Sequence, residues 1–212
     1  MSEQHDLTKA QTYTASNIEE REGLEAMRGT PTLFLSDLEH GGITHSALEV
    51  ITNSNDELMA FPHANAKLIV VLCKDSARNS FQWVIQDTGR GMPYEVGESG
   101  KSVFVQCLTK PHTSGKFNQD SYTISGGQFG VGLKATTAMS RALRCLTHRT
   151  TGSASLTVRQ GVFGPENLII DETYIAAETG TTTVYEPDNT IFAGVETYAE
   201  IGYAMVISLL RQ

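Results

Sequence analysis

The segment SALEVITNSNDELMA, residues 46–60, has the spacing of an amphipathic helix and gathers polar groups on one side of it. Glu49, Asn53 and Asp56 are four and then three residues apart, so a helix places them on one face. A carboxylate and an amide at this spacing can orient a water molecule and bind Mg²⁺, because hard cations prefer oxygen ligands. Taken alone, the segment favours the alternative of an ordinary solvated helix face. The apolar remainder of the helix includes Leu48, Ile51 and Met59.

The composition is that of one globular domain. The chain has 212 residues, of which 40% are hydrophobic and 19% charged, and this is enough apolar material for a single packed core. A formal net charge of −8 disfavours a broad phosphate-binding surface, so we expect weak nucleic-acid binding by this chain alone. Neither a membrane-length apolar run nor a signal peptide is recognisable, and the expected location is cytoplasmic.

The cysteines and histidines give no sign of a metal centre. Cys73, Cys107 and Cys145 are far apart in sequence and have apolar neighbours, so we expect buried, reduced thiols rather than disulfides or metal ligands. The six histidines are scattered, and we interpret them as surface or core residues.

The order of predicted elements indicates an α+β protein. Residues 1–22 lack apolar periodicity and are interpreted as an N-terminal arm, whereas residues 23–212 form the predicted domain. Residues 93–125 are rich in turn-forming residues and predict a long loop around one apolar segment. Helices are expected at 22–31, 45–61, 134–143 and 196–212, and strands at 66–74, 80–89, 143–149, 153–160, 166–172 and 181–187. We predict a two-layer α/β sandwich with a mixed β-sheet covered on one face by helices.

Two later motifs place polar or flexible groups where a ligand could bind. In QDTGRGMP, residues 86–93, Asp87 ends a strand and precedes two glycines, so it can accept a hydrogen bond from an exocyclic amine beside a close-fitting turn. SGGQFGVGLKA, residues 125–135, opens a helix with a glycine-rich loop, and helix N-termini favour anionic phosphate. Each motif alone is also compatible with an ordinary turn or loop.

A third motif, TGTTTVYEP at residues 179–187, offers hydroxyl groups. Thr179, Thr181 and Thr182 could line a pocket, although threonine is also a common residue in strands.

In this order, the four motifs resemble the ATP-binding (Bergerat) fold of the GHKL superfamily, which includes gyrase, histidine kinases and MutL. The closer resemblance is to the ATPase domain of the B subunits of bacterial type II DNA topoisomerases, DNA gyrase and topoisomerase IV. It extends over nearly everything from Gly23 onward. The segments that carry it are GLEAMRGTP (23–31), EVITNSNDELMA (49–60), QDTGRGMP (86–93), SGKFNQDSYTISGGQFGVGLKATTAMS (114–140), TGTTTVYEPDNTIF (179–192) and ETY (196–198).

The resemblance implies ATP and Mg²⁺ as cofactors and a role for each matching residue. Glu49 would be the general base that activates water, and Asn53 the Mg²⁺ ligand. Asp87 would accept from the adenine amine, assisted by Thr181 through a bound water. Lys116 would lie in a lid over the phosphates, and Tyr13 would reach a partner's nucleotide. The phosphate loop would comprise Gly127, Gln128, Phe129, Gly130, Val131, Gly132 and Leu133. Pocket-wall or supporting positions would be Asp56, Glu57, Arg90, Gly91 and Pro93.

Several positions depart from the family pattern. Thr52 stands where relatives have an aspartate, and Gln128 and Phe129 replace a leucine and a histidine in the phosphate loop. The resemblance also implies that the transducer domain, with its lysine that contacts the γ-phosphate, and the metal-binding domain lie outside this chain. We therefore expect ATP binding with slow hydrolysis by the isolated domain.

The expected partners follow from the same resemblance. They are a second copy that dimerises through the arm when nucleotide binds, the DNA-cleavage subunit (the A subunit of gyrase or its topoisomerase IV counterpart), DNA, and ATP-competitive gyrase inhibitors. ATP would drive dimer closure for DNA strand passage in the full enzyme. The alternative function is a non-catalytic module that senses nucleotide or pairs with a topoisomerase. A histidine kinase is disfavoured, because GKFNQDSY is topoisomerase-like and a phospho-acceptor helix is lacking.

Overall fold

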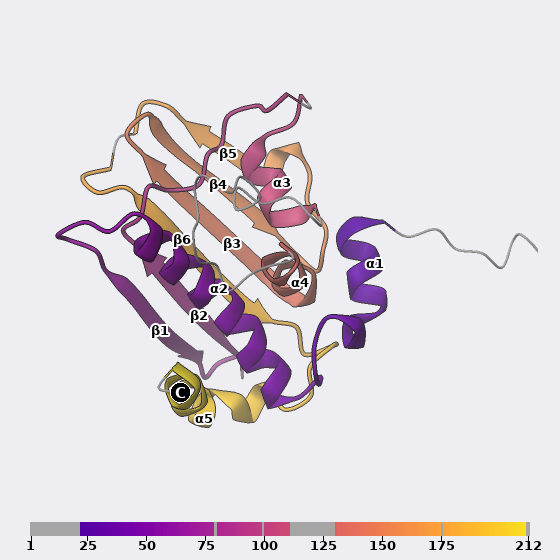
Figure 1. Cartoon of the computed structure of the whole chain (residues 1–212). Coiled ribbons are helices and arrows are strands. Elements are labelled where there is room, and N and C mark those ends of the chain that lie inside the picture. The colour runs from indigo at the N-terminus through magenta and orange to yellow at the C-terminus, as the bar shows by residue number, and fades with distance from the viewer. Residues whose placement is uncertain (1–21, 79, 99, 111–129, 175, 211–212) are drawn as a thin grey trace, which may run out of the picture.

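The computed structural model describes residues 22–78, 80–98, 100–110, 130–174 and 176–210 as one sheet with helices packed against it (Figure 1). The helices are α1 (Gly23–Gly29), α2 (His40–Ala60), α3 (Val103–Thr109), α4 (Gly132–Met139) and α5 (Val195–Leu210), with short 3₁₀ helices at Pro31–Leu33 and Pro165–Asn167. The strands are β1 (Leu68–Asp75), β2 (Ser80–Asp87), β3 (Ser140–Arg149), β4 (Gly152–Val158), β5 (Leu168–Asp171) and β6 (Gly180–Pro187).

The strands form one six-stranded sheet in the order β1-β2-β6-β3-β4-β5. All five neighbouring pairs are antiparallel. The α+β two-layer prediction is confirmed, but the mixed sheet was wrong. The last strand in sequence, β6, enters between two hairpins and runs opposite to both neighbours, so no parallel pair arises among the described strands.

The helices cover one face of the sheet, and the core lies between the two layers. Helix α2 crosses this face beside α4, and α5 packs near the ends of β1 and β2 (Figure 1). On β2, alternate residues Phe81, Trp83 and Ile85 point toward the helices and are almost completely buried. Tyr198 of α5 stacks on Phe81 with ring centroids 4.9 Å apart. The period of two also sends Asp87 toward the helical layer.

Helix α2 begins five residues earlier than the sequence predicts. It starts at His40 because the Asp37 carboxylate accepts hydrogen bonds from the backbone N–H groups of Glu39 (2.9 Å) and Gly42 (2.7 Å). Gly41 and Gly42 lower the helix propensity of this stretch. A larger residue would not fit at position 42, because its Cβ would lie 2.1 Å from the Asp37 carbonyl oxygen. The cap therefore outweighs the low helix propensity.

Other differences from prediction have local causes. The apolar segment inside the predicted loop forms α3, because Phe104 and Leu108 are one helical turn apart and both become buried. Helix α4 ends at Met139, and the chain continues directly into β3. Met59 is 73% exposed, so it adds nothing to the apolar side of α2. Cys73 is also exposed, because it alternates onto the face of β1 turned away from the helices, whereas Cys145 is buried as expected.

No helix in the part of the chain described here is long and apolar enough to cross a membrane.

A partly buried ion pair connects α1 to the residue after β6. The Arg28 guanidinium donates to the Asp188 carboxylate and to the carbonyl of Ala138 (2.7 Å). Asp188 is only 1% exposed and also accepts from Gln160 (3.1 Å) and Thr190 (2.9 and 2.8 Å). Burial raises the pKa of this carboxyl, but the hydrogen bonds from Thr190, Arg28 and Gln160 together lower it by more. The pKa of Asp188 therefore lies below its usual value.

Replacing Arg28 with Ala is expected to destabilise the domain by about 2–4 kcal/mol, because it leaves a buried carboxylate without its cation. Since the folded-state pKa of Asp188 is depressed, its contribution is present at neutral pH and is lost as the pH falls through that pKa. Urea unfolding between pH 7 and pH 3 measures both effects. Asp188→Asn should show a weaker pH dependence than wild type over this range; an unchanged dependence would contradict the assignment.

Candidate functional site

Asp87 lies at the end of β2 as a buried, hydrogen-bonded carboxylate. It is 4% exposed and accepts from the Ser54 hydroxyl (2.8 Å), the Gly89 N–H (3.0 Å) and the Thr181 N–H (3.2 Å). Burial raises the pKa of this carboxyl, and the three hydrogen bonds oppose the shift. A carboxylate has about four acceptor positions, so Asp87 can take a further donor such as an amine.

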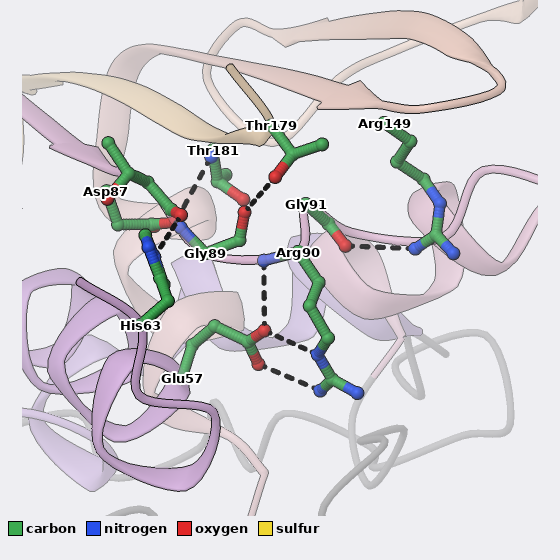
Figure 2. Close-up of polar contacts among 10 residues, drawn as sticks. Glu57, His63, Asp87, Gly89, Arg90, Gly91, Arg149, Thr179 and Thr181 are labelled. Atoms are coloured by element: carbon green, nitrogen blue, oxygen red, sulfur yellow. Dashed lines mark hydrogen bonds and ion pairs between the residues drawn. The ribbon is translucent and has the colours of Figure 1, made fainter. Parts of the chain in front are cut away.

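The turn after Asp87 is held by side chains from three separate segments, which are the loop after α2, strand β3 and the residues just before β6; Figure 2 shows one donor from each, His63, Arg149 and Thr179. Four carbonyl groups of the turn each accept a hydrogen bond from one side chain. The donor–acceptor pairs are His63 and the Thr88 carbonyl (2.8 Å), Thr179 and the Gly89 carbonyl (2.8 Å), Arg149 and the Gly91 carbonyl (3.0 Å), and Thr147 and the Met92 carbonyl (2.9 Å). An irregular loop normally leaves such groups to water. Here the protein itself satisfies them, which fixes the backbone beside Asp87 before any ligand arrives.

Gly91 is required by this geometry. It has a φ of +76°, and a Cβ there would lie 2.4 Å from the carbonyl oxygen of His148 and 2.9 Å from the Thr147 hydroxyl. The turn is therefore pressed against β3, and only glycine combines this backbone conformation with this close approach. Pro93, two residues later, is exposed at the end of the turn.

Glu57 and Arg90, predicted pocket-wall residues, form an ion pair beside this turn. Arg90 Nε and Nη2 donate to the two Glu57 carboxylate oxygens at 2.7 and 3.0 Å, and the Arg90 backbone N–H donates to the same carboxylate at 3.2 Å (Figure 2). This two-pronged geometry matches the planar guanidinium to the carboxylate. Asp56, the neighbouring acidic residue, points inward and is buried.

Glu49 reaches the start of α4. A Cβ on Gly132 would lie 1.7 Å from Glu49 Oε2, so the carboxylate occupies the space that any larger residue would need. Gly130 has a φ of +60°, and Val131 is the N-cap of α4, so this segment turns sharply into the helix. The first N–H groups of α4 and the Glu49 carboxylate are thus neighbours.

A single helix carries both halves of the site. Glu49 lies against the start of α4, and Ser54 donates to Asp87. These two residues of α2 are five positions apart, which is roughly 7.5 Å along the helix axis. Asn53 lies one helical turn after Glu49 and is half-buried. The predicted helix face and strand-end carboxylate therefore belong to one region of the molecule.

Five predicted residues lie outside the described part of the chain, and their roles stay predictions. They are Tyr13, Lys116, Gly127, Gln128 and Phe129.

Among the predicted residues that are described, Leu133 is buried in α4 and Thr181 pairs with Asp87 across β6 and β2. Thr182 is next to Thr181 on a strand and therefore faces the opposite side of the sheet, away from Asp87.

The structure adds five residues that sequence reasoning missed, one of which is Ser54, the hydroxyl donor to Asp87. His45 contacts Glu49, with Nε2 to Oε1 at 3.2 Å, while His63, Thr147 and Arg149 donate to the turn. His45 precedes Glu49 by four residues in a predicted helix, so spacing alone could have found it. The three donors to the turn come from loops and strands far away in sequence, and no local pattern points to them.

The hydrogen bond to Glu49 raises the pKa of His45; burial opposes the shift, and the charges of Glu49 and Asp37 support it. In Glu49→Gln, we expect the pKa of His45 to fall toward its ordinary value of 6.5. Titration of the histidine ring resonances by NMR measures this shift directly. The other five histidines of the chain provide the internal control, and an unmoved His45 would show that the contact is not formed in solution.

Comparison with known proteins identifies the relatives of this chain, although no family model matches it. It is 33% identical over 186 residues to the DNA gyrase B protein of Borrelia hermsii, covering 87% of this chain and 28% of that protein. It is 34% identical over 193 residues to the DNA gyrase B protein of Archaeoglobus fulgidus, covering 89% of this chain and 29% of that protein. It is 31% identical over 192 residues to the B subunit of DNA topoisomerase 4 from Staphylococcus epidermidis, covering 91% of this chain and 28% of that protein.

A solved structure agrees with these relatives. The 43K ATPase domain of Thermus thermophilus gyrase B, crystallised with an aminocoumarin, superimposes with a TM-score of 0.60 at 22% identity, covering 81% of this chain and 40% of that one. The fold is therefore the α+β fold of the gyrase B ATPase domain. The chain is related over most of its length to the B subunits of the type II DNA topoisomerases, gyrase and topoisomerase IV, as its motifs predict. It spans less than a third of the length of these curated relatives.

Proposed function

We propose that this chain binds ATP with Mg²⁺ and hydrolyses it, acting as the ATPase domain of a type II topoisomerase B subunit. The observation that carries the proposal is the arrangement on α2. Glu49 fills the space at Gly132 where α4 begins, and Ser54 holds Asp87 at the other end. A nucleotide extends from a purine to a triphosphate, and this site offers an acceptor for the first and helix N–H groups for the second.

At the purine end, Asp87 accepts a hydrogen bond from the adenine amine, and Thr181 supports the same edge of the base through a water molecule. The turn beside Asp87 is already held in place, so little conformational freedom is lost on binding. The walls are Glu57, Arg90 and Gly91.

At the phosphate end, Glu49 takes the proton from the attacking water, and His45 orients its carboxylate. The N–H groups at the start of α4 face the phosphates and favour their negative charge.

The described residues also fit the magnesium requirement. None of them forms a group of three or more His, Cys, Asp or Glu that could hold a metal by itself. An Asn53 amide oxygen on the same helix as Glu49 suits Mg²⁺, which takes few protein ligands and completes its shell with water and substrate phosphates. Bound Mg²⁺ would neutralise phosphate charge, which allows a protein of net charge −8 to bind ATP.

The whole enzyme is a further part of the proposal. Its activity would be ATP-driven dimer closure for DNA strand passage in the cytoplasm, with a DNA-cleavage subunit as partner and the N-terminal arm exchanging between two copies. ATP-competitive gyrase inhibitors should compete with ATP for this site.

Isothermal titration calorimetry tests the binding proposal. We expect Mg²⁺-dependent heat with ATP and with a non-hydrolysable analogue, and competition between them. Absence of binding by both nucleotides would overturn the proposal. Adding a transducer fragment from a related gyrase separates the enzyme from the non-catalytic module, because stimulated turnover supports the enzyme and indifference supports the module.

A further inference from the structure

An aromatic ring covers one face of the Arg90 guanidinium. Phe61 is the first residue after α2, and its ring centroid lies 3.2 Å from Arg90 Cζ. Its backbone N–H donates to the Glu57 carbonyl at 3.0 Å, which continues the helical hydrogen-bond pattern by one residue. Glu57 and Phe61 are therefore four residues apart at one helix end and contact the same arginine.

This arrangement fixes Arg90 more firmly than the ion pair alone. The Arg90 side chain is 52% exposed, and an exposed ion pair contributes little in water. A ring against the guanidinium removes water from one face and adds a cation–π attraction. The C-terminal end of α2 lies at the same place, and its partial negative charge also favours a cation.

The fixed Arg90 in turn fixes the backbone beside Asp87. The Arg90 N–H donates to the carboxylate that holds its side chain, so side chain and backbone are set together. The Glu57 side chain is pressed against the turn, since a Cβ on Gly89 would lie 2.5 Å from Glu57 Cγ. Gly89 in turn donates to Asp87. One continuous set of contacts thus runs from Phe61 to the predicted adenine acceptor.

We infer that Phe61 is a positioning residue that acts through Arg90 to hold the turn after Asp87 and so sharpens selection of adenine over guanine. The inference rests on the proposed function. Adenine carries an amine where guanine carries a carbonyl oxygen, so a well-placed carboxylate accepts from the first and repels the second. A looser turn weakens the hydrogen bond to adenine. It thereby reduces the difference in affinity between adenine and guanine nucleotides.

The test compares Phe61→Leu, which keeps an apolar side chain without a ring face, with Phe61→Trp, which keeps the face. Affinities for non-hydrolysable ATP and GTP analogues are measured by calorimetry. Phe61→Leu should weaken ATP binding about 3- to 5-fold and reduce the ATP-to-GTP ratio, and Phe61→Trp should retain both. Met59→Ala, two residues earlier on the exposed side of α2, is the matched control and should behave as wild type.

A double-mutant cycle with Arg90→Ala shows whether Phe61 acts through Arg90. In that background, Phe61→Leu should have no further effect on ATP affinity, and the same non-additivity should appear in Tm without nucleotide. An undiminished effect would overturn the inference, as would Phe61→Leu binding like wild type or Phe61→Trp failing to retain the ratio. Wild type that binds neither nucleotide would overturn the proposed function and this inference together, whereas a negative result with binding wild type removes the inference alone.

Discussion

Replacing Glu49 with Ala is expected to lower ATP turnover by about 100-fold or more, while ATP affinity stays within a few-fold of wild type. General-base catalysis typically supplies two to four orders of magnitude in rate, roughly 10²–10⁴-fold, and is lost when the base is removed. The proposed purine contacts at Asp87 lie at the other end of the site, so the substitution should not alter them. A coupled phosphate-release assay gives turnover, and calorimetry with a non-hydrolysable analogue gives affinity.

Because the isolated domain is expected to hydrolyse slowly, the comparison is best made with a transducer fragment added to both proteins. Glu49→Gln is the matched variant, since it keeps the size of the side chain against Gly132 while removing the base. Turnover by Glu49→Gln close to that of wild type would rule out the assigned role. Equal loss of turnover and affinity in Glu49→Ala would indicate a binding residue instead.

The main elements of this fold were predictable because their local signals agree with the tertiary structure. The apolar run followed by turn residues predicts a strand at residues 80–89, and β2 is found at Ser80–Asp87; α2 ends at Ala60, close to the predicted boundary. Where the sequence misled, either a local helix cap or burial in the tertiary structure was responsible. The Asp37 carboxylate extends α2 across two glycines, and burial of Phe104 and Leu108 turns a predicted loop segment into α3.

For the candidate site, the sequence predicts which groups lie near one another but not the residues that support them. Motif order places Glu49 and Asp87 together, and the structure joins them through α2. The donors that hold the turn, such as Arg149, are brought there by the strand order, which local sequence patterns do not encode. The role of Phe61 could not be predicted from the sequence, because it depends on the contact of its ring with Arg90 in the folded structure.

Replacing Asp87 with Asn is expected to weaken ATP binding about 100-fold or more while leaving the fold intact. One oxygen of Asp87 accepts from the N–H groups of Gly89 and Thr181, so the amide oxygen of Asn takes that position. The amide NH₂ then replaces the oxygen that faces Ser54. An adenine amine would meet a donor instead of an acceptor, and an unpaired polar group in a buried site costs far more than a lost contact at the surface.

Stability should respond in the opposite sense, which separates a binding role from a structural one. Burial raises the pKa of Asp87 above its unfolded value, so its ionisation disfavours folding as the pH rises through the folded-state pKa. Asn carries no charge and escapes this cost, so Asp87→Asn should have a Tm at neutral pH equal to or above that of wild type. Ser54→Ala removes one donor and keeps the carboxylate, and it should weaken ATP binding much less. ATP binding by Asp87→Asn within a few-fold of wild type would show that the purine lies elsewhere.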